Sequence, residues 1–297
     1  MKYKIAVIIS CYNEEKNIFK IYKKIIESIK NSDKILEYEL IFIEDNSKDK
    51  TKENIKKIVK ENKNVSIIEF KKRKGKSIGL QVAFDKIDSD TDLVFMMDAD
   101  LQDDPKEIDR FIKKIEEGYD LVSGYKKNRL DNFEKRYASK LYNKMINLIF
   151  CMNLHDHNCG FKCFRKKVLK NLKIYDNLHR FITVFVKEYG YKVSEITVDH
   201  HKRLYGKSKY GFLRYFIGLK DIIRVKFIIT HRKKRAFLFD LLFLILIIFL
   251  FYKNINTLII FLCIFAFIYG LLIYNLNKYN KFKIEDYDIF YEFNNTK

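Results

Sequence analysis

Residues 93–100 have the sequence LVFMMDAD, in which an apolar run ends in two carboxylates separated by one small residue. A short, continuous apolar run is typical of a strand buried on both faces of a parallel sheet. Similar β-rich runs occur at Lys4–Ser10, Tyr38–Glu44, Val65–Phe70, Asp92–Met97 and Asp120–Gly124. Segments of helical length follow at Glu14–Lys30, Thr51–Asn62, Lys76–Lys86 and Pro105–Glu117. This alternation predicts an α/β fold with a mostly parallel, Rossmann-like sheet that carries helices on both faces.

Polar side chains collect just after these predicted strands. They lie in the segments Ser10–Glu15, Glu44–Asp49 and Asp98–Pro105. Open parallel sheets bind ligands beyond the carboxyl ends of their strands, so we expect the functional site there. Acidic groups brought together at one edge would repel each other unless a cation or a basic ligand lay among them.

The carboxylates of Asp98 and Asp100 predict a site for Mg²⁺ or Mn²⁺, with Gln102 as a further oxygen ligand. Such ions are usually held by one or two carboxylates together with phosphate oxygens of a substrate. Asp45 also follows a buried strand, and we expect it to hold a ribose or a base. The basic run Lys71–Lys76 opens the helix after the third strand, which by itself is a weak indication of phosphate binding.

The pattern changes after Gly124. A long amphipathic helix is predicted at Asp131–Phe150, shorter helical segments at Lys166–Lys173 and Phe181–Tyr189, and a strand at Lys192–Val198. His155–Lys162 and His200–Gly211 are predicted polar loops, in which His200 and His201 favour surface or phosphate contacts over metal ligation. Apolar residues at helical spacing from Phe212 to Thr230, with basic residues between them, predict a helix lying in a membrane interface.

Two apolar segments follow, Ala236–Tyr252 and Thr257–Tyr274, each near the lower length limit for crossing a bilayer. Basic residues precede and follow the pair, so the positive-inside rule places both ends in the cytoplasm. We therefore predict a large cytoplasmic domain over 1–211, an interfacial helix region over 212–235, a transmembrane two-helix hairpin over 236–276 and a cytoplasmic tail over 277–297. The expected location is the cytoplasmic membrane, with the protein multi-pass and both termini cytoplasmic.

The net charge of +20 does not by itself indicate a nucleic-acid partner. Much of the lysine excess is scattered over predicted helix faces, and no basic stripe interleaved with aromatic residues forms a recognisable nucleic-acid-binding module. Attraction to anionic lipid remains open. The cysteines form no CxxC pair and no Cys/His set at zinc spacing, which fits reduced thiols in a cytoplasmic domain.

Seven motifs then occur in a fixed order. SCYNEE at 10–15 resembles PxYNEE with Ser10 in place of proline, EDNSKDKT at 44–51 resembles DDGSxDxT, and DADLQDDP at 98–105 matches a family motif throughout. VSGYKKNR at 122–129, HDHNCGFK at 155–162, HRF at 179–181 and RLYGKSKY at 203–210 resemble VSGxRxxR, xDxNCGxK, HRF and RxxGxSKY. Over about residues 1–230 the chain thus resembles family 2 glycosyltransferases of the GT-A fold. The similar group is the polyprenyl-phosphate one, with dolichol-phosphate mannose synthases and bacterial undecaprenyl-phosphate glucosyl- and aminoarabinosyltransferases.

The resemblance implies a role for each matching position. The nucleotide-sugar would be bound by Ser10, Tyr12, Glu14, Ile43, Asp45, Lys76, Asp98, Ala99, Arg203 and Lys209, and the metal by Asp98, Asp100 and Gln102. The catalytic residues would be Asp100, Asp156 and Arg203, with Asp156 near the sugar or the acceptor. The acceptor phosphate would be held by Arg129, Arg203, Lys207 and Lys209. The departures at Ser10 and Glu44 bear on base selectivity more than on activity.

The implied reaction is an inverting transfer of a sugar, from a nucleotide-sugar to a polyprenyl phosphate such as undecaprenyl or dolichyl phosphate, at the cytoplasmic membrane face. A cation and basic side chains would stabilise the charge that develops on the departing nucleotide. The lipid phosphate is already an anion near neutral pH and needs little general-base help. A UDP-hexose is the expected donor and GDP-mannose the alternative, and a homo-oligomer is possible.

Other functions are open to the residues alone. A processive polysaccharide synthase shares the N-terminal half of this pattern but carries a QxxRW motif, and this chain contains no Trp. A nucleotidyltransferase that makes nucleotide-sugars would not need a double-spanning tail. A non-enzymatic membrane scaffold or nucleic-acid-binding protein would use the positive charge and leave the acidic turn without a role.

Overall fold

The computed structural model describes residues 1–127, 133–199, 201, 214–232, 255–281 and 289–293. The chain forms two compact units: Met1–Gly211 together with Ile284–Lys297, and Phe212–Lys283. The first unit is built around one sheet. The described part of the second includes the helices α7 (Arg214–Arg232) and α9 (Ile255–Lys281).

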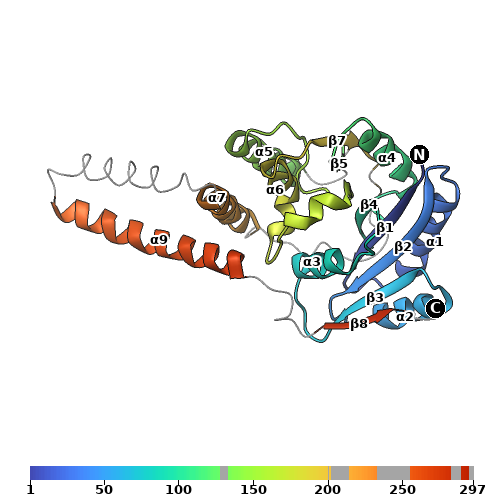
Figure 1. Cartoon of the computed structure of the whole chain (residues 1–297). Coiled ribbons are helices and arrows are strands. Elements are labelled where there is room, and N and C mark those ends of the chain that lie inside the picture. Colours follow the sequence, from blue (N-terminus) through green and yellow to red (C-terminus); the bar gives the residue numbers. More distant parts are fainter. Residues whose placement is uncertain (128–132, 200, 202–213, 233–254, 282–288, 294–297) are drawn as a thin grey trace. The chain divides into compact units, whose positions relative to one another are not determined.

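The sheet has the strand order β7-β5-β6-β4-β1-β2-β3-β8 (Figure 1). The strands are β1 (Tyr3–Cys11), β2 (Ile35–Glu44), β3 (Val65–Phe70), β4 (Leu93–Asp98), β5 (Leu121–Tyr125), β6 (Lys162–Arg165), β7 (Val193–Thr197) and β8 (Ile289–Phe293). β1 pairs in parallel with both β2 and β4, and β2 with β3, while β6 and β8 run antiparallel to their neighbours. The predicted α/β class with a mostly parallel sheet is confirmed.

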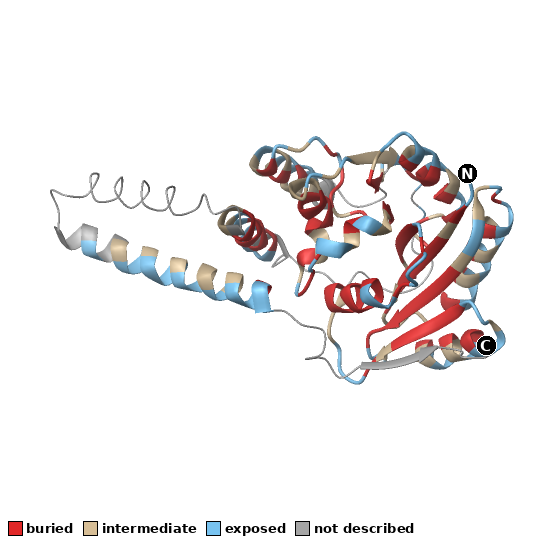
Figure 2. Ribbon diagram, viewed as in Figure 1, coloured by how far each residue is buried: buried red, intermediate tan, exposed pale blue. Residues whose placement is uncertain are grey.

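The helices of this unit are α1 (Ile18–Lys30), α2 (Thr51–Glu61), α3 (Lys76–Lys86), α4 (Ile108–Glu116), α5 (Phe133–Phe150) and α6 (Ile182–Glu188). α1 buries Ile18, Ile21, Ile25 and Ile29, which are spaced to lie along one side of a helix. They join one hydrophobic core with α2, α4 and alternate strand residues such as Ile5, Val7 and Ile9. Figure 2 shows this burial concentrated on the strands and on the helix sides that face them.

Helix α3 packs on the opposite face of the sheet and is buried nearly all round. All residues from Ser77 to Phe84 are buried, because α3 contacts β1, β2 and β3 on one side and the 3-10 helix Leu178–Phe181 on the other. Gly79 allows the close packing: a Cβ there would lie 2.5 Å from Cγ2 of Ile43. The amino end of α3 is thereby fixed beside the ends of the parallel strands.

The structure adds two strands to the prediction and changes one helix. β6 was not predicted because Lys162–Arg165 is short and charged at both ends, yet it inserts antiparallel between β4 and β5. The predicted helical segment Lys166–Lys173 is a 3-10 helix over Lys166–Asn171. β8 lies in the predicted tail and pairs with β3, so residues 284–297 belong to the first unit.

In the second unit, one helix among the described residues is long and apolar enough to cross a membrane, at Leu262–Lys281. It forms most of α9, which extends beyond the predicted segment Thr257–Tyr274 at both ends. The other predicted span, Ala236–Tyr252, lies outside the described residues.

Strand β8 covers the edge of the sheet, and a chain ending at Lys283 is expected to expose the free backbone groups of β3. We predict a loss of about 2 kcal/mol of stability, because each net backbone hydrogen bond contributes about 0.5–1.5 kcal/mol. The melting temperature should fall by about 5 °C, with increased light scattering from edge-to-edge association. A chain ending at Phe293 keeps β8 and serves as the control; equal melting temperatures for the two truncations would contradict the prediction.

Candidate active site

The register of the parallel strands brings the predicted nucleotide-binding residues to one edge. Ser10 pairs with Ile43 on one side and with Asp98 on the other, and Cys11 pairs with Glu44. The backbones of three strand ends are therefore adjacent although they are distant in sequence. This places Ser10, Ile43, Asp98 and the loops that follow them around a single region.

Two of these loops are joined by side-chain hydrogen bonds. The Asn13 amide donates to Ser47 Oγ at 3.0 Å, the Lys48 amide donates to Asn13 Oδ1 at 2.8 Å, and the Glu14 amide donates to Thr51 Oγ1 at 2.7 Å. Asn13 and Asn46 have φ values of 55° and 59°, in the left-handed region that asparagine tolerates better than most residues. The segment that carries Tyr12 and Glu14 is thus held in one conformation.

Asp45 organises the basic loop that precedes α3. Its carboxylate accepts the backbone N–H groups of Lys74 at 2.7 Å and Gly75 at 3.0 Å. Burial raises the pKa of Asp45, and these N–H groups and Arg73 offset part of that increase. Arg73 in turn lies over the Tyr12 ring, 4.0 Å from its centroid. The expected contact of Asp45 with a ribose or base stays a prediction, and in this structure the carboxylate holds the loop.

The acidic turn after β4 is balanced by two lysines. Asp98 forms an ion pair with Lys76 Nζ, and Asp103 lies 2.8 Å from Lys126 Nζ with its side chain only 1% exposed. Burial would raise the pKa of Asp98, but the adjacent Lys76 ammonium outweighs it and the pKa is lowered. The Asp98 carboxylate is therefore present as an anion beside a cation from α3, and a second cation, from the end of β5, lies next to Asp103.

Backbone geometry fixes the turn itself. Leu101 is buried and has a φ of 61°, an unfavourable conformation for a residue of this kind, which indicates strain held by its surroundings. Asp100 Oδ1 accepts the Gln102 N–H at 3.1 Å, and the Gln102 carbonyl accepts the His201 N–H at 3.0 Å. The His201 ring also lies 3.1 Å from Asp104, so His201 contacts this turn through both its backbone and its side chain.

The backbone at Gly160 lies close to the carboxylate of Asp98. A Cβ at this position would lie 2.6 Å from Asp98 Oδ2 and 3.5 Å from Lys76 Nζ. The loop is held by Lys162, whose buried ammonium donates to Ser123 Oγ at 2.7 Å, to the Cys159 carbonyl at 2.7 Å and to the His157 carbonyl at 3.1 Å. Gly160 and Lys162 both belong to the HDHNCGFK motif, whose pattern did not predict a role for either residue.

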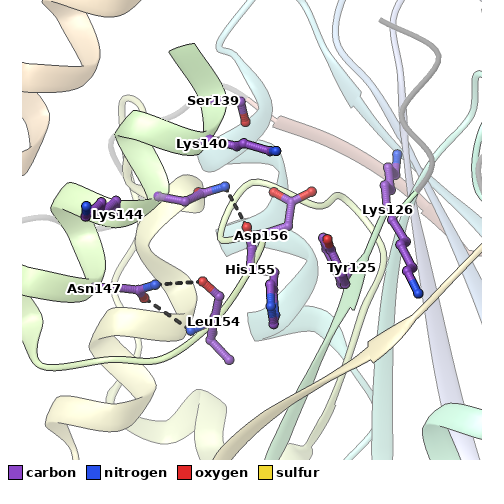
Figure 3. Close-up of a pocket in the computed structure, with 11 residues that line it drawn as sticks. Tyr125, Lys126, Ser139, Lys140, Lys144, Asn147, Leu154, His155 and Asp156 are labelled. Atoms are coloured by element: carbon purple, nitrogen blue, oxygen red, sulfur yellow. Dashed lines mark hydrogen bonds between the residues drawn. The ribbon is translucent and has the colours of Figure 1, made fainter. Parts of the chain in front are cut away.

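Asp156, on the same loop, lines a cavity of about 380 Å³ next to α5. Its carboxylate accepts the Asn158 N–H at 3.0 Å and is directed toward Ser139 and Lys140 of α5 (Figure 3). Asn143 of α5 donates to the His155 carbonyl at 2.8 Å. Lys126 also lines this cavity, so one lysine contacts both the cavity and the acidic turn.

Ser77 and His179 form a contact that the sequence analysis did not include among its site residues. Ser77 follows Lys76 at the start of α3. Its Oγ lies 2.7 Å from the ring Nδ1 of His179 and accepts the backbone N–H of His179 at 3.1 Å. Burial, assisted by Lys76, lowers the pKa of His179 well below its usual range, which keeps the ring neutral. The HRF motif contained this histidine but did not reveal its partner.

Several predicted site residues lie outside the described residues: Arg129, Arg203, Lys207 and Lys209. Among the residues that the structure describes, no three His, Cys, Asp or Glu side chains gather as a metal-binding group. The predicted ligation of a divalent ion by Asp98, Asp100 and Gln102 therefore stays a prediction, and it would need oxygens of a substrate to complete the coordination, as is usual for Mg²⁺.

Comparisons with known proteins identify the family of this arrangement. Residues 6–173 match the model of the family described as glycosyl transferase family 2. The undecaprenyl-phosphate 4-deoxy-4-formamido-L-arabinose transferase of Proteus mirabilis is 31% identical over 221 residues, which are 74% of this chain and 67% of that protein. The dodecaprenyl-phosphate galacturonate synthase of Rhizobium johnstonii is 30% identical over 240 residues, which are 79% of this chain and 70% of that protein.

Solved structures share the fold at lower identity. A mannosyltransferase from Pyrobaculum calidifontis, in complex with GDP-Man and Mn²⁺, matches with a TM-score of 0.54 and 16% identity, over 78% of this chain and 65% of that one. Glucosyl-3-phosphoglycerate synthase from Mycobacterium tuberculosis, in complex with Mn²⁺, UDP and phosphoglyceric acid, matches with a TM-score of 0.54 and 15% identity, over 75% and 76% of the chains.

Gly160→Ala tests the close approach to Asp98. The added methyl would displace the carboxylate, and we expect kcat/KM for sugar transfer to fall about 100-fold, as for other small displacements of reacting groups. Thermal unfolding and initial rates should be measured together. Gly118→Ala is the control: nothing lies within 4 Å of its Cβ and its φ is 97°, so it should lower stability and spare activity. Full activity of Gly160→Ala would contradict the inference that the space at Gly160 is needed to position Asp98.

His157, in the loop of residues 155–162, makes the free energy of unfolding depend on pH. The ring is fully buried between Thr183 Oγ1 at 3.0 Å and Asn147 Oδ1 at 2.9 Å, and burial lowers its pKa to about 3. The unfolded chain, with a histidine pKa of about 6.5, binds the proton first, so stability is lost as pH falls below 6.5.

We expect this group to remove about 2 kcal/mol between pH 7 and pH 5. Urea unfolding of the wild type and of His157→Gln at both pH values isolates the effect from other titrating groups. The variant should lose less stability on acidification; an equal loss in both proteins would show that His157 is not responsible.

Proposed function

We propose, because the chain belongs to glycosyl transferase family 2, that this glycosyltransferase moves a sugar from a nucleotide-sugar to a polyprenyl phosphate. The two similar relatives described above act, by their names, with undecaprenyl and dodecaprenyl phosphate. The observation that carries the proposal is the acidic turn of Asp98 and Asp100, which lies at the end of β4 beside Lys76 and Gly160.

We assign Asp98 and Asp100 to a Mg²⁺ or Mn²⁺ ion shared with the donor diphosphate. When bound, the ion would neutralise the charge that develops on the departing nucleotide. The hard carboxylate oxygens suit either ion, and the missing Cβ of Gly160 leaves room at Asp98 Oδ2. Gln102 directs its backbone N–H to Asp100, which orients that carboxylate, and its side chain is the third predicted ligand.

The nucleotide would lie across the ends of β1 and β2. Tyr12 and Glu14 come from the loop that is fixed to residues 47–51, while Ile43 and Asp45 come from the end of β2. Lys76 is the best-placed described cation for the diphosphate, because it already contacts Asp98 from the amino end of α3, where helix N–H groups favour anions. Arg203 and Lys209, the other predicted diphosphate contacts, lie outside the described residues.

The acceptor site is proposed at the cavity that Asp156 lines. Four lysines also line this cavity (Lys126, Lys127, Lys140 and Lys144), so it presents an excess of positive charge to a lipid phosphate. Such a phosphate is its own nucleophile, and the role left for Asp156 is to contact the sugar or orient these lysines. Attack in line with the departing diphosphate would invert the anomeric carbon. Arg129, Arg203, Lys207 and Lys209 are the further predicted contacts of the acceptor phosphate.

The donor is proposed to be a UDP-hexose, with GDP-mannose as the alternative. Of the two solved structures described above, one carries GDP-Man and the other UDP. The fold therefore suits both nucleotides, and Ser10 and Glu44, which depart from the family motifs, are the positions to vary for base selectivity.

The membrane arrangement is proposed to be a hairpin with both ends in the cytoplasm. β8, which follows α9, pairs with β3 of the catalytic domain, so the segment between residues 211 and 284 would cross the bilayer an even number of times. The apolar part of α9 would supply one crossing. The other predicted span, Ala236–Tyr252, lies outside the described residues. The chain boundaries stay as predicted, except that residues 284–297 are grouped with the catalytic domain; self-association stays a prediction.

Asp100→Asn should lower transfer at least about 1,000-fold, because a catalytic metal contributes several kcal/mol to transition-state stabilisation. The assay incubates membranes containing polyprenyl phosphate with radiolabelled UDP-hexoses or GDP-mannose and extracts the lipid product. EDTA should abolish wild-type activity, and Mg²⁺ or Mn²⁺ should restore it. Asp85→Asn, on α3 and bonded to Gln81 at 3.3 Å, is the control and should remain active.

Each part of the proposal can fail separately in this assay. An unaffected Asp100→Asn variant removes the metal assignment. Lipid phosphate that is no better an acceptor than water removes the carrier-lipid assignment, even if donor hydrolysis depends on Asp100.

A further inference from the structure

Helix α5 exposes large apolar side chains along one face. Tyr137, Leu141 and Leu148 are 65%, 52% and 80% exposed, and their spacing of four and seven residues places them on one side of the helix. Ile146 and Phe150 lie on the opposite side and are buried. α5 is thus packed against the domain by one apolar face and carries a second apolar face that points outward.

The charge of this helix is mainly positive. Lys140 and Lys144 are exposed beside Leu141 and Leu148, and over the whole of α5 the basic residues outnumber the single acidic residue, Glu134. Exposed leucines flanked by an excess of lysines are typical of helices that lie on anionic membranes. This excess of positive charge matches an anionic lipid surface.

The same helix forms a wall of the cavity at Asp156. Lys140 and Lys144 line that cavity, and Figure 3 shows Lys140 extending from α5 above the Asp156 carboxylate. Asn143 and Asn147 hold the opposite wall by hydrogen bonds to the backbone of His155 and Leu154, each 2.8 Å long. A surface that contacts α5 from outside is therefore one helix diameter away from the proposed acceptor site.

We propose that the face formed by Tyr137, Leu141 and Leu148, with Lys140 and Lys144, docks on the anionic surface of the bilayer. Docked there, α5 would hold the cavity at Asp156 at the depth of lipid phosphates, so that an acceptor phosphate enters without leaving the membrane. This inference rests on the proposed lipid acceptor. It adds a second membrane contact, within the catalytic domain itself, to the one made by the apolar helices.

The absence of Trp from the chain allows a direct test. Leu148→Trp and Leu141→Trp each place a single Trp on the proposed contact, and Leu36→Trp is the matched control. Leu36 is 66% exposed near the start of β2, at the end of the strand opposite the site. Each full-length variant is reconstituted in vesicles of phosphatidylglycerol and phosphatidylcholine, or of phosphatidylcholine alone, with and without lipids brominated along their chains.

Because interfacial helices bury their apolar face about 5–10 Å below the headgroups, we expect bromolipids to quench at least about half of the emission of Leu148→Trp and Leu141→Trp. Quenching should be stronger in the anionic vesicles, and Leu36→Trp should show little in either. Blue-shifted emission without quenching would mean that protein, such as a second copy of the chain, covers the face. That result, or equal quenching at residues 36 and 148, would overturn the proposal.

Activity measurements on the same samples separate this inference from the proposed function. Strong quenching with no transfer to polyprenyl phosphate would leave the membrane contact intact and remove its proposed purpose. Efficient transfer without quenching would leave the function intact and remove the contact of α5. Leu148→Glu then gives an independent check: it should raise the KM for lipid phosphate several-fold and leave the KM for the donor unchanged.

Discussion

The site depends on the electrostatic balance at the carboxyl edge of the parallel sheet. Parallel pairing of β1 with β2 and β4 brings Asp98 and Glu44 to one edge through the register of Ser10 and Cys11, and the turn after β4 adds Asp100 and Asp103. Carboxylates so placed would repel one another if they were left unpaired. Lys76 and Lys126 balance the turn, and the N–H groups of residues 46 and 47 satisfy Glu44. The edge is thus charged and ordered before any ligand is present, as expected for electrostatic stabilisation that needs no reorganisation during the reaction.

The packing of α3 makes this balance possible. α3 is fixed from both sides, because it is buried between the sheet and the 3-10 helix Leu178–Phe181. Gly79 lets it lie close to Ile43, and Asp45 fixes the loop that leads into it. Lys76 is consequently delivered to Asp98 by a rigid element, while Gly160 and the Lys162 hydrogen bonds close the site from the other side. Positions of this kind gain their precision from buried supports rather than from the ligand-binding loops themselves.

A lipid acceptor explains features that a soluble reaction would not need. The cavity at Asp156 is lined by lysines, α5 exposes apolar side chains beside it, and α9 is apolar enough to span a bilayer. The edge strand β3 is closed by β8, which comes from beyond the apolar helices. Pairing between residues so far apart in sequence forms late in folding, because the loop-closure entropy must be overcome first. The catalytic sheet would therefore be completed only after the intervening helices have been placed.

Much of this architecture was determined by the sequence alone. Continuous apolar runs predicted the parallel strands, with β3 at its observed bounds Val65–Phe70, and helical spacing predicted the helices, with α3 at its observed bounds Lys76–Lys86. The DADLQDDP motif indicated the family. These features are local, and period and composition report them directly. Only the tertiary structure decided the rest: the antiparallel insertion of β6, the return of β8, the Ser77–His179 contact and the pairs of Lys76 and Lys126 with their aspartates. Each of these joins segments that are distant in the chain, and a charge pattern cannot show which lysine reaches which carboxylate until packing has fixed the positions of both.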